Sequence, residues 1–206
     1  YVTDSAEKSA AFLRLNPTID VASNWSRHQL RLSTGARIKE MAKYSDESQR
    51  AWFVRSSGRL DIYGASYAGG AASVERLYQD RLTGDFPTTS ARPIGYVQTQ
   101  GSLQGMHAFD RVRVTAGVGV RKLGFSNTRT ITGGTLDNSG RDNTATQVQA
   151  RIDYAISPAI AVYVSPSTTK TDYDNDTGVF APTRDSKETK VMVGADFDLT
   201  ALMRGE

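Results

Sequence analysis

The chain has 206 residues, of which 25 are lysine or arginine and 22 are aspartate or glutamate, so its formal net charge is +3. It contains no cysteine, which excludes disulfide scaffolds, cysteine-ligated zinc and thiol nucleophiles. The basic residues are scattered without forming a run or a tail, a pattern that does not favour nucleic-acid binding. We predict a single domain over residues 1–206.

The mean hydropathy is negative, and the sequence has no run of about 18 apolar residues that would predict a transmembrane helix. A transmembrane β-barrel remains compatible with such an average, because only every second strand residue meets lipid. The periodicity of the apolar residues therefore has to distinguish a transmembrane β-barrel from a soluble protein. The sequence starts at Tyr1 with neither an initiator methionine nor a signal peptide, so we expect a processed chain or a fragment.

Apolar and polar residues alternate with a period of two along most of the chain, which predicts β-strands with one apolar and one polar face. In the clearest case, Val148 and Ile152 alternate with Gln147 and Gln149. The stretch 67–78 is rich in glycine and alanine and is only weakly patterned. The nine candidate strands lie at 11–22, 29–39, 51–62, 67–78, 94–104 and 111–125, on the two sides of a turn at 157–158, and at 189–199.

The connections between these stretches alternate between short and long. Short links are expected at 23–27, 63–66, 105–110, 157–158 and 200–203, and long polar loops at 43–49, 79–93, 126–144 and 171–187. This alternation is typical of an up-and-down barrel in an outer membrane, and the strand length of about ten residues suits a tilted span. We therefore predict an all-β, antiparallel transmembrane barrel of about 9–10 strands, in which Pro17 and Pro166 disturb the strand pairing.

The alternation assigns side chains to two environments. We predict that the pore is lined by Arg31, Arg37, Arg55, Arg59, Arg111, Arg113, Arg121, Arg151, Asp61, Asp153, Gln98, Gln100, Gln147 and Gln149. The lipid-facing set comprises Val112, Val114, Val118, Val148, Ile152, Ile160, Val162 and Val164. Because arginine outnumbers acidic residues on the polar faces, we expect the lumen to favour anions. The alternative is that these charges neutralise one another across neighbouring strands and plug a narrow barrel.

An enzyme is not expected. His28 and His107 both lie at short turns, and neither has a nucleophile and an acid nearby in the sequence at a recognisable spacing. We recognise no motif for a cofactor or a metal ion, and we expect none to be needed.

Several segments carry a resemblance to a known family: the turn Asn24–His28, the strand "RVRVTAGVGVRKLGF" at 111–125 and the stretch "VGADFDLTALMRGE" at 193–206. The chain resembles the outer-membrane β-barrel porins of alphaproteobacteria of the beta-barrel porin 2 type. The resemblance implies a barrel in the outer membrane of a Gram-negative bacterium, with a suspected link to exopolysaccharide export for some members. Family members are longer, which leaves open whether this chain is a barrel truncated at both ends and part of a larger one.

Three functions follow as hypotheses. The first is a porin-like passive channel, or the membrane component of surface polysaccharide export. The second is a non-conducting barrel that serves as an anchor or scaffold through its surface loops, and the third is a soluble all-β binding protein. The partners expected for the membrane hypotheses are outer-membrane lipid and lipopolysaccharide, surface polysaccharide or small anionic solutes, and a second copy or other envelope proteins.

Overall fold

The computed structural model describes residues 11–79, 81, 86–174, 184–200 and 203–205. Within them, period-two alternation produces one large antiparallel sheet of eleven strands. The strands of this sheet are β1 Phe12–Leu15, β2 Thr18–Ala22, β3 His28–Met41, β4 Gln49–Asp61, β5 Tyr67–Tyr78, β6 Gly95–Phe109, β7 Val112–Phe125, β10 Asn143–Ser157, β11 Ile160–Tyr173, β12 Ser186–Thr200 and β13 Met203–Gly205. The predicted all-β, antiparallel architecture is confirmed.

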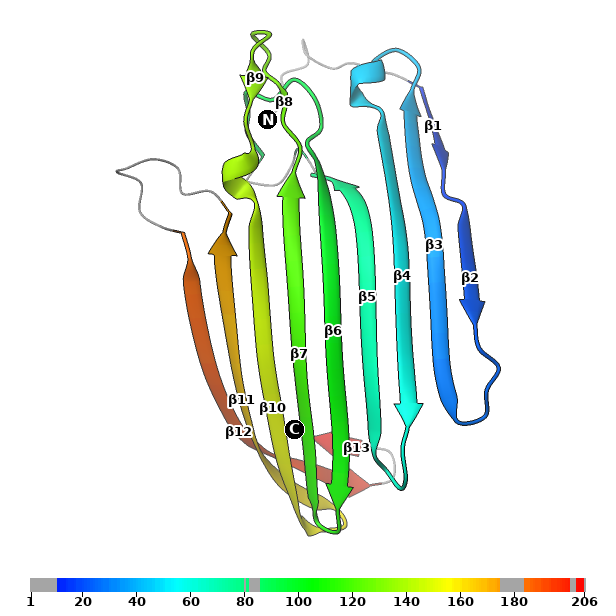
Figure 1. The fold of residues 1–206 in the computed structure, drawn as a ribbon, viewed down its shortest axis with the longest axis vertical. Coiled ribbons are helices and arrows are strands. Elements are labelled where there is room, and N and C mark those ends of the chain that lie inside the picture. The colour runs from blue at the N-terminus through cyan, green and yellow to red at the C-terminus, as the bar shows by residue number, and fades with distance from the viewer. Residues whose placement is uncertain (1–10, 80, 82–85, 175–183, 201–202, 206) are drawn as a thin grey trace.

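Each long strand pairs with the next long strand along the chain, in the order β1-β3-β4-β5-β6-β7-β10-β11-β12-β13. Both β1 and β2 pair with β3, β1 with residues 38–41 and β2 with residues 31–35. The sheet curves, so that β12 and β13 pass behind the strands at its centre (Figure 1). In the described part of the chain no pairing joins β1 or β2 to β12 or β13. Closure of the sheet into a barrel therefore stays a prediction.

The two ends of the sheet differ as the sequence predicts. Among the described residues, the long links β3–β4 and β7–β10 lie at one end and the tight turns lie at the other (Figure 1). We call these the long-loop end and the short-turn end. Two small 3-10 helices, η2 (Ser45–Glu47) and η3 (Ser139–Arg141), and a small hairpin of β8 (Thr128–Arg129) with β9 (Thr135–Leu136) belong to the long-loop end.

One predicted turn is misplaced. The link expected at 105–110 is mostly strand, because β6 continues to Phe109 and the chain reverses at Asp110 and Arg111. Asp110 adopts a φ of 44°, the left-handed conformation that aspartate tolerates in tight turns. The predicted pore-lining residue Arg111 consequently lies in a turn and not within a strand.

The two prolines disturb the pairing as expected. Pro17 divides the predicted strand 11–22 into β1 and β2, and its carbonyl accepts a hydrogen bond from the Ala36 N–H at 3.0 Å. Pro166 lies within β11, where the ladder with β10 is interrupted between Ser167 and Val164. There the Ser165 hydroxyl donates to the Ala150 carbonyl at 3.2 Å, which satisfies an acceptor that the proline leaves without its usual partner.

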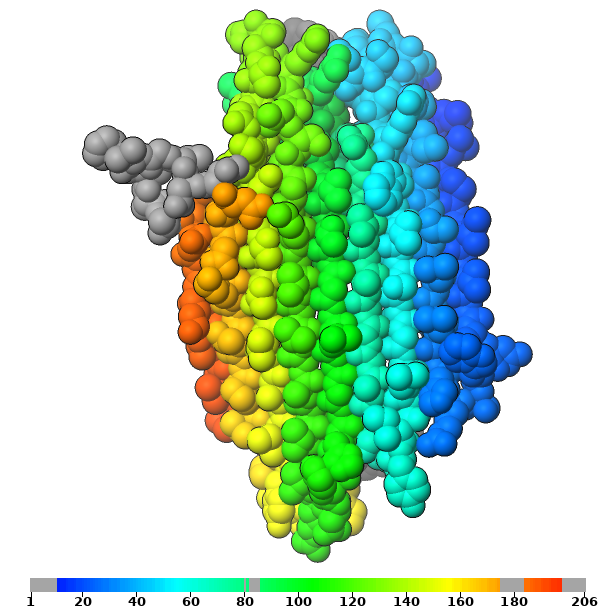
Figure 2. Space-filling model, viewed as in Figure 1, coloured from blue at the N-terminus to red at the C-terminus, as the bar shows by residue number. Residues whose placement is uncertain are grey.

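The sheet is a single layer with almost no conventional core. Only three large apolar side chains in the described residues are buried: Phe53, Phe86 and Ile94. On the convex face, Val148 is 50% exposed and Ile152 is 45% exposed, and the surface is continuous without a deep hollow (Figure 2). No helix in the described residues is long and apolar enough to cross a membrane. An apolar face with nothing packed on it is unfavourable in water.

Two aromatic rings on the opposite, concave face lie directly over glycines of the neighbouring strand. A Cβ atom at Gly35 would approach the Phe53 ring to 2.8 Å, and one at Gly194 would approach the Tyr163 ring to 2.7 Å. Glycine at these positions lets the rings lie flat on the sheet. The same rings contact cations, since the Arg55 guanidinium is 4.5 Å from the Phe53 centroid and that of Arg151 is 3.7 Å from the Tyr163 centroid.

Candidate functional site

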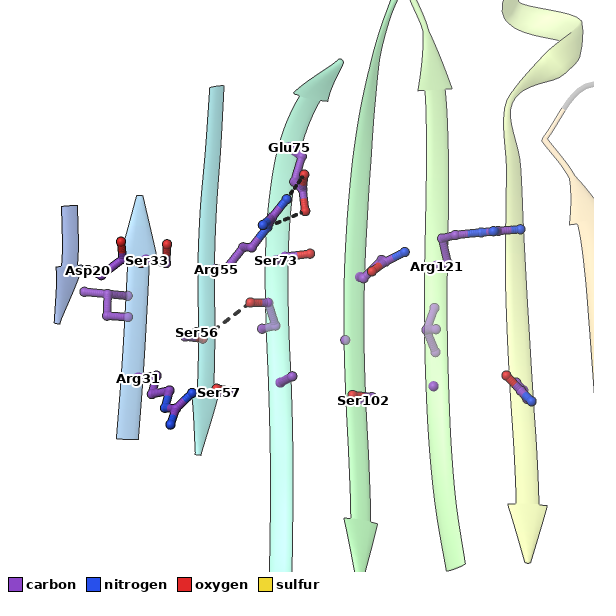
Figure 3. Close-up of a pocket in the computed structure, with 18 of the residues that line it drawn as sticks. Asp20, Arg31, Ser33, Arg55, Ser56, Ser57, Ser73, Glu75, Ser102 and Arg121 are labelled. Atoms are coloured by element: carbon purple, nitrogen blue, oxygen red, sulfur yellow. Dashed lines mark hydrogen bonds and ion pairs between the residues drawn. The ribbon is translucent and has the colours of Figure 1, made fainter. Parts of the chain in front are cut away.

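A cavity of about 960 Å³ occupies the concave face and is lined by residues from β2 to β11. The residues that define it fall into two rows of register partners, which the pairing carries across successive strands. Figure 3 views this face, with the strands in the reverse left-to-right order of Figure 1. The first row is Ser33, Arg55, Ser73, Gln100, Arg121 and Ala145, and the second is Arg31, Ser57, Ala71, Ser102, Gly119 and Gln147.

The cavity exists because most of its floor is made of small side chains. Ser57, Ala71, Ser102 and Gly119 lie next to one another on four adjacent strands. Side chains of this size barely rise above the sheet, so they leave open volume between the larger residues that flank them. Sequence analysis did not select these four positions, because a small residue in an alternating pattern carries no charge or apolar signal.

The electrostatics of the cavity are dominated by three arginines. Arg55 is neutralised, because its Nε and Nη2 donate to the two carboxylate oxygens of Glu75 at 2.8 and 2.7 Å (Figure 3). Arg31 and Arg121 also line the cavity, and within the described residues neither guanidinium makes a hydrogen bond or an ion pair. Asp20 is the remaining carboxylate of the lining. The cavity therefore carries an excess of positive charge.

Nearer the short-turn end, the arginines of the concave face are paired with carboxylates, so the charges there balance. The buried carboxylate of Asp153 accepts from Arg113 Nε at 3.2 Å and from Arg151 Nε at 2.8 Å. The Nη2 of Arg151 also donates to Asp196 at 2.6 Å. Arg59 pairs with Asp61 at 2.6 Å, also close to the short turns. We call Arg113, Arg151, Asp153 and Asp196 the Asp153 network.

The predicted pore-lining residues thus divide into three groups. The structure brings together Arg31, Arg55, Arg121, Gln100 and Gln147 in the cavity, and it places Arg59 and Gln149 in two smaller adjoining cavities. Those outside these cavities are Arg37, Arg111, Arg113, Arg151, Asp61, Asp153 and Gln98. That any of them lines a conducting pore stays a prediction.

The predicted lipid-facing residues follow the convex face. Val118, Val148, Ile152, Ile160 and Val162 are between 39% and 50% exposed, and Val112, Val114 and Val164 are partly exposed. Register partners continue this face from strand to strand, as with Val148 beside Val118 and Ile152 beside Val164. No described helix or second sheet covers them, so the packing of a soluble sandwich is not present here.

The structure adds a contact at His107 that the sequence spacing does not reveal. Sequence analysis found no nucleophile near it, but Ser66 of the neighbouring short turn lies 2.6 Å from its Nδ1. Ser66 is buried, and its backbone carbonyl accepts from the Ile62 N–H at 2.8 Å. His107 makes no hydrogen bond to a carboxylate among the described residues. Without that orienting acid, the geometry fits a turn-stabilising contact better than a catalytic pair.

The loops at the long-loop end pack against one another. Ile94 is fully buried and Ser90, whose side chain bonds the Arg92 carbonyl at 2.7 Å, is 2% exposed. Ser90 also forms a β-bridge with Thr130, which joins two loops distant in sequence. In the loop before η3, hydrogen bonds from the backbone N–H and the hydroxyl of Ser139 hold the pKa of Asp137 below its usual range. These loops therefore form an ordered rim.

The curved up-and-down sheet, with an apolar convex face and a polar concave one, defines the architecture of β-barrel porins. A family model described as "Putative beta-barrel porin 2" matches residues 1–206. The chain belongs to this family. No curated protein and no solved structure matches the chain.

Proposed function

We propose that the protein is a porin-like channel of the bacterial outer membrane, whose lumen is the concave face and whose solutes are small anions. The convex face meets lipid, and the sheet forms part of the wall of a closed barrel. Closure is required in hydrocarbon, because each unpaired backbone N–H or C=O there costs several kcal/mol.

The observation that carries the anion preference is the net positive charge of the cavity of about 960 Å³, where among the described residues the guanidiniums of Arg31 and Arg121 make no ion pair and Asp20 is the carboxylate left beside them. Fixed cations along a wet passage attract anions and replace part of their hydration. Paired arginines contribute little to this field, because the carboxylate beside each one cancels it at a distance of several ångströms. Arg31 and Arg121 lie on the same concave face, on β3 and β7, so a solute that fills the cavity meets both of them (Figure 3).

The experiment is a measurement of the reversal potential in planar bilayers under a potassium chloride gradient. We expect the wild-type protein to prefer chloride and the Arg31→Ala/Arg121→Ala variant to lose most of that preference. The matched control is Arg55→Ala/Glu75→Ala, which removes an ion pair and leaves the net charge unchanged. A reversal potential that is the same in wild type and the Arg31/Arg121 variant contradicts the proposal.

The ordered rim favours a second candidate, in which the barrel conducts nothing and displays its loops as a scaffold, for surface polysaccharide export among other roles. The loops are tied together by side chains, as where Arg81 pairs with Glu47 of the neighbouring loop. A rim of this kind suits a binding surface as well as a channel mouth. The absence of any conductance from correctly folded protein in bilayers would favour the scaffold.

A further inference from the structure

A separate cavity, of about 460 Å³, lies at the long-loop end, where the convex face meets the rim. Its lining comes from four separate parts of the chain: the η2 turn, the end of β5, the segment before β6 and the β8–β9 hairpin. Arg76, Arg92 and Arg129 all line it, together with one carboxylate, Asp46. We call it the rim cavity.

The charge of the rim cavity is not balanced. Asp46 is paired with Arg92. Arg76 and Arg129 make no ion pair among the described residues, and the Arg76 guanidinium lies 5.9 Å from the centroid of the Tyr78 ring. Gly95 lies close to the Arg76 guanidinium, since a Cβ there would lie at ordinary contact distance, 3.5 Å, from both Arg76 Nη2 and the Tyr78 ring. Two free guanidinium forks in one concave site are suited to a phosphate group, which each can bind through two hydrogen bonds.

The position of the rim cavity indicates where such a phosphate would come from. Arg76 is on the same face of β5 as the exposed Val74, two residues away, and its register partner is the exposed Trp52. The cavity therefore opens at the upper border of the convex apolar face. That border is where the head groups of membrane lipids lie, and where tryptophan and tyrosine are enriched.

The other outward-facing cations show the same asymmetry. From β2 to β12, strand alternation puts lysine or arginine on the convex face only in the parts of the strands next to the long loops: Arg50, Arg76, Lys122, Lys170 and Lys187. Three of these have a carboxylate partner nearby, namely Arg50 with Glu40, Lys122 with Asp174 and Lys170 with Asp172. Within the described strands, the lysines and arginines of the convex face are thus confined to the border next to the long loops, which matches a bilayer whose anionic surface lies on that side.

We propose that the rim cavity binds a phosphate monoester on the sugar head group of a glycolipid in the leaflet next to the long loops. Arg76 and Arg129 hold the phosphate, and the polar lining contacts the sugar. The inference rests on the membrane placement made under the proposed function, but it does not depend on whether the barrel conducts.

The test uses the full chain folded in zwitterionic detergent micelles and counts bound ligand by native mass spectrometry. Three probes are compared: a glycolipid with a doubly phosphorylated glucosamine disaccharide head group, the same glycolipid after phosphatase treatment, and inorganic phosphate. We expect the phosphorylated glycolipid to bind at least tenfold more tightly than either of the others, since each charged hydrogen bond lost weakens binding by about that factor.

Two variants and a control locate the site. Arg76→Ala/Arg129→Ala is expected to weaken binding of the phosphorylated glycolipid at least tenfold, and the matched control Arg27→Ala/Arg111→Ala, at the short-turn end, to leave it unchanged. Arg76→Lys/Arg129→Lys keeps the charge and is expected to lose only part of the affinity, which keeps the test valid should the alanine variant fail to fold.

Three results would overturn the inference: equal binding by wild type and the Arg76/Arg129 variants, equal binding of the dephosphorylated glycolipid, or inorganic phosphate binding as tightly as the glycolipid. The reversal potential of the Arg76→Ala/Arg129→Ala variant separates this inference from the channel proposal. It is expected to equal that of the wild type, because both arginines lie outside the concave cavity.

Discussion

Two regions of the concave face carry the same residue type and differ in what surrounds it. In the cavity, Arg31 and Arg121 stand among serine, alanine and glycine without a carboxylate partner, whereas Arg113 and Arg151 share the buried carboxylate of Asp153. Both pairs occupy polar positions of alternating strands, and the sequence pattern treats them alike. The comparison teaches that an arginine on a polar face becomes part of a binding field or part of the framework according to whether a carboxylate lies within its reach, on its own strand, as with Arg151 and Asp153, or on a nearby one, as with Arg113 and Asp153.

The sequence left open an anion-favouring lumen and the neutralisation of charges across strands. The two interpretations apply to different parts of the same sheet along the strand direction. Neutralisation across strands describes the region near the short turns, where Asp61, Asp153 and Asp196 are all paired. A lining with a net positive charge describes the cavity. The acidic partners of the network tie β10 to β7 and, across β11, to β12, while the cavity leaves Arg31 and Arg121 free to meet a solute.

The largest effect on stability is expected from Asp153→Asn. The carboxylate is 5% exposed and accepts from two arginines, so the amide leaves at least one guanidinium without its partner. We expect a loss of about 2 kcal/mol in the free energy of unfolding. Urea unfolding in phospholipid vesicles measures it.

The matched control for this variant is Asp20→Asn, which changes a carboxylate that lines the cavity and has no ion-pair partner in the described chain. Its free energy of unfolding should stay within about 0.5 kcal/mol of wild type. Equal losses for the two variants would show that the Asp153 network does not have the framework role assigned to it here.

A smaller effect on stability, with a clear effect on selectivity, is expected from Ser57→Asp. Ser57 is the register partner of Arg31, so the new carboxylate gives the cavity an ion pair of the kind found in the network. We expect stability to rise by about 0.2–1 kcal/mol and the chloride preference to fall. Ser57→Asn is the control, and an undiminished chloride preference in Ser57→Asp would contradict the role given to Arg31.

Much of the fold could be predicted from the sequence because strand alternation is a local property. The weakly patterned stretch 67–78 proved to be β5 with the same bounds, since its neighbours on both sides specify where it pairs. The turn at 105–110 was wrong because Met106, His107 and Ala108 continue β6, and nothing in their residue types distinguishes a polar strand end from a turn.

The site could be predicted only in part. Arg31 and Arg121 were selected as polar-face arginines, but their lack of an ion pair depends on the adjacent strands, which place Ala22 and Ser57 opposite Arg31 and Gln100 and Ala145 opposite Arg121. Ser57 and Ser102 form the floor of the cavity only because four strands align small residues in one row. Such alignment depends on the register between strands, and the sequence of one strand does not specify that register.

The central claim is that lipid meets the convex face of β10 while water meets its concave face. Because the chain has no cysteine, single cysteines at positions 147 to 152 can each carry a nitroxide spin label in protein reconstituted into vesicles. The account predicts that labels at 148, 150 and 152 are relaxed by oxygen, which partitions into hydrocarbon, and those at 147, 149 and 151 by a water-soluble nickel chelate. Equal access of the chelate to all six labels would contradict it.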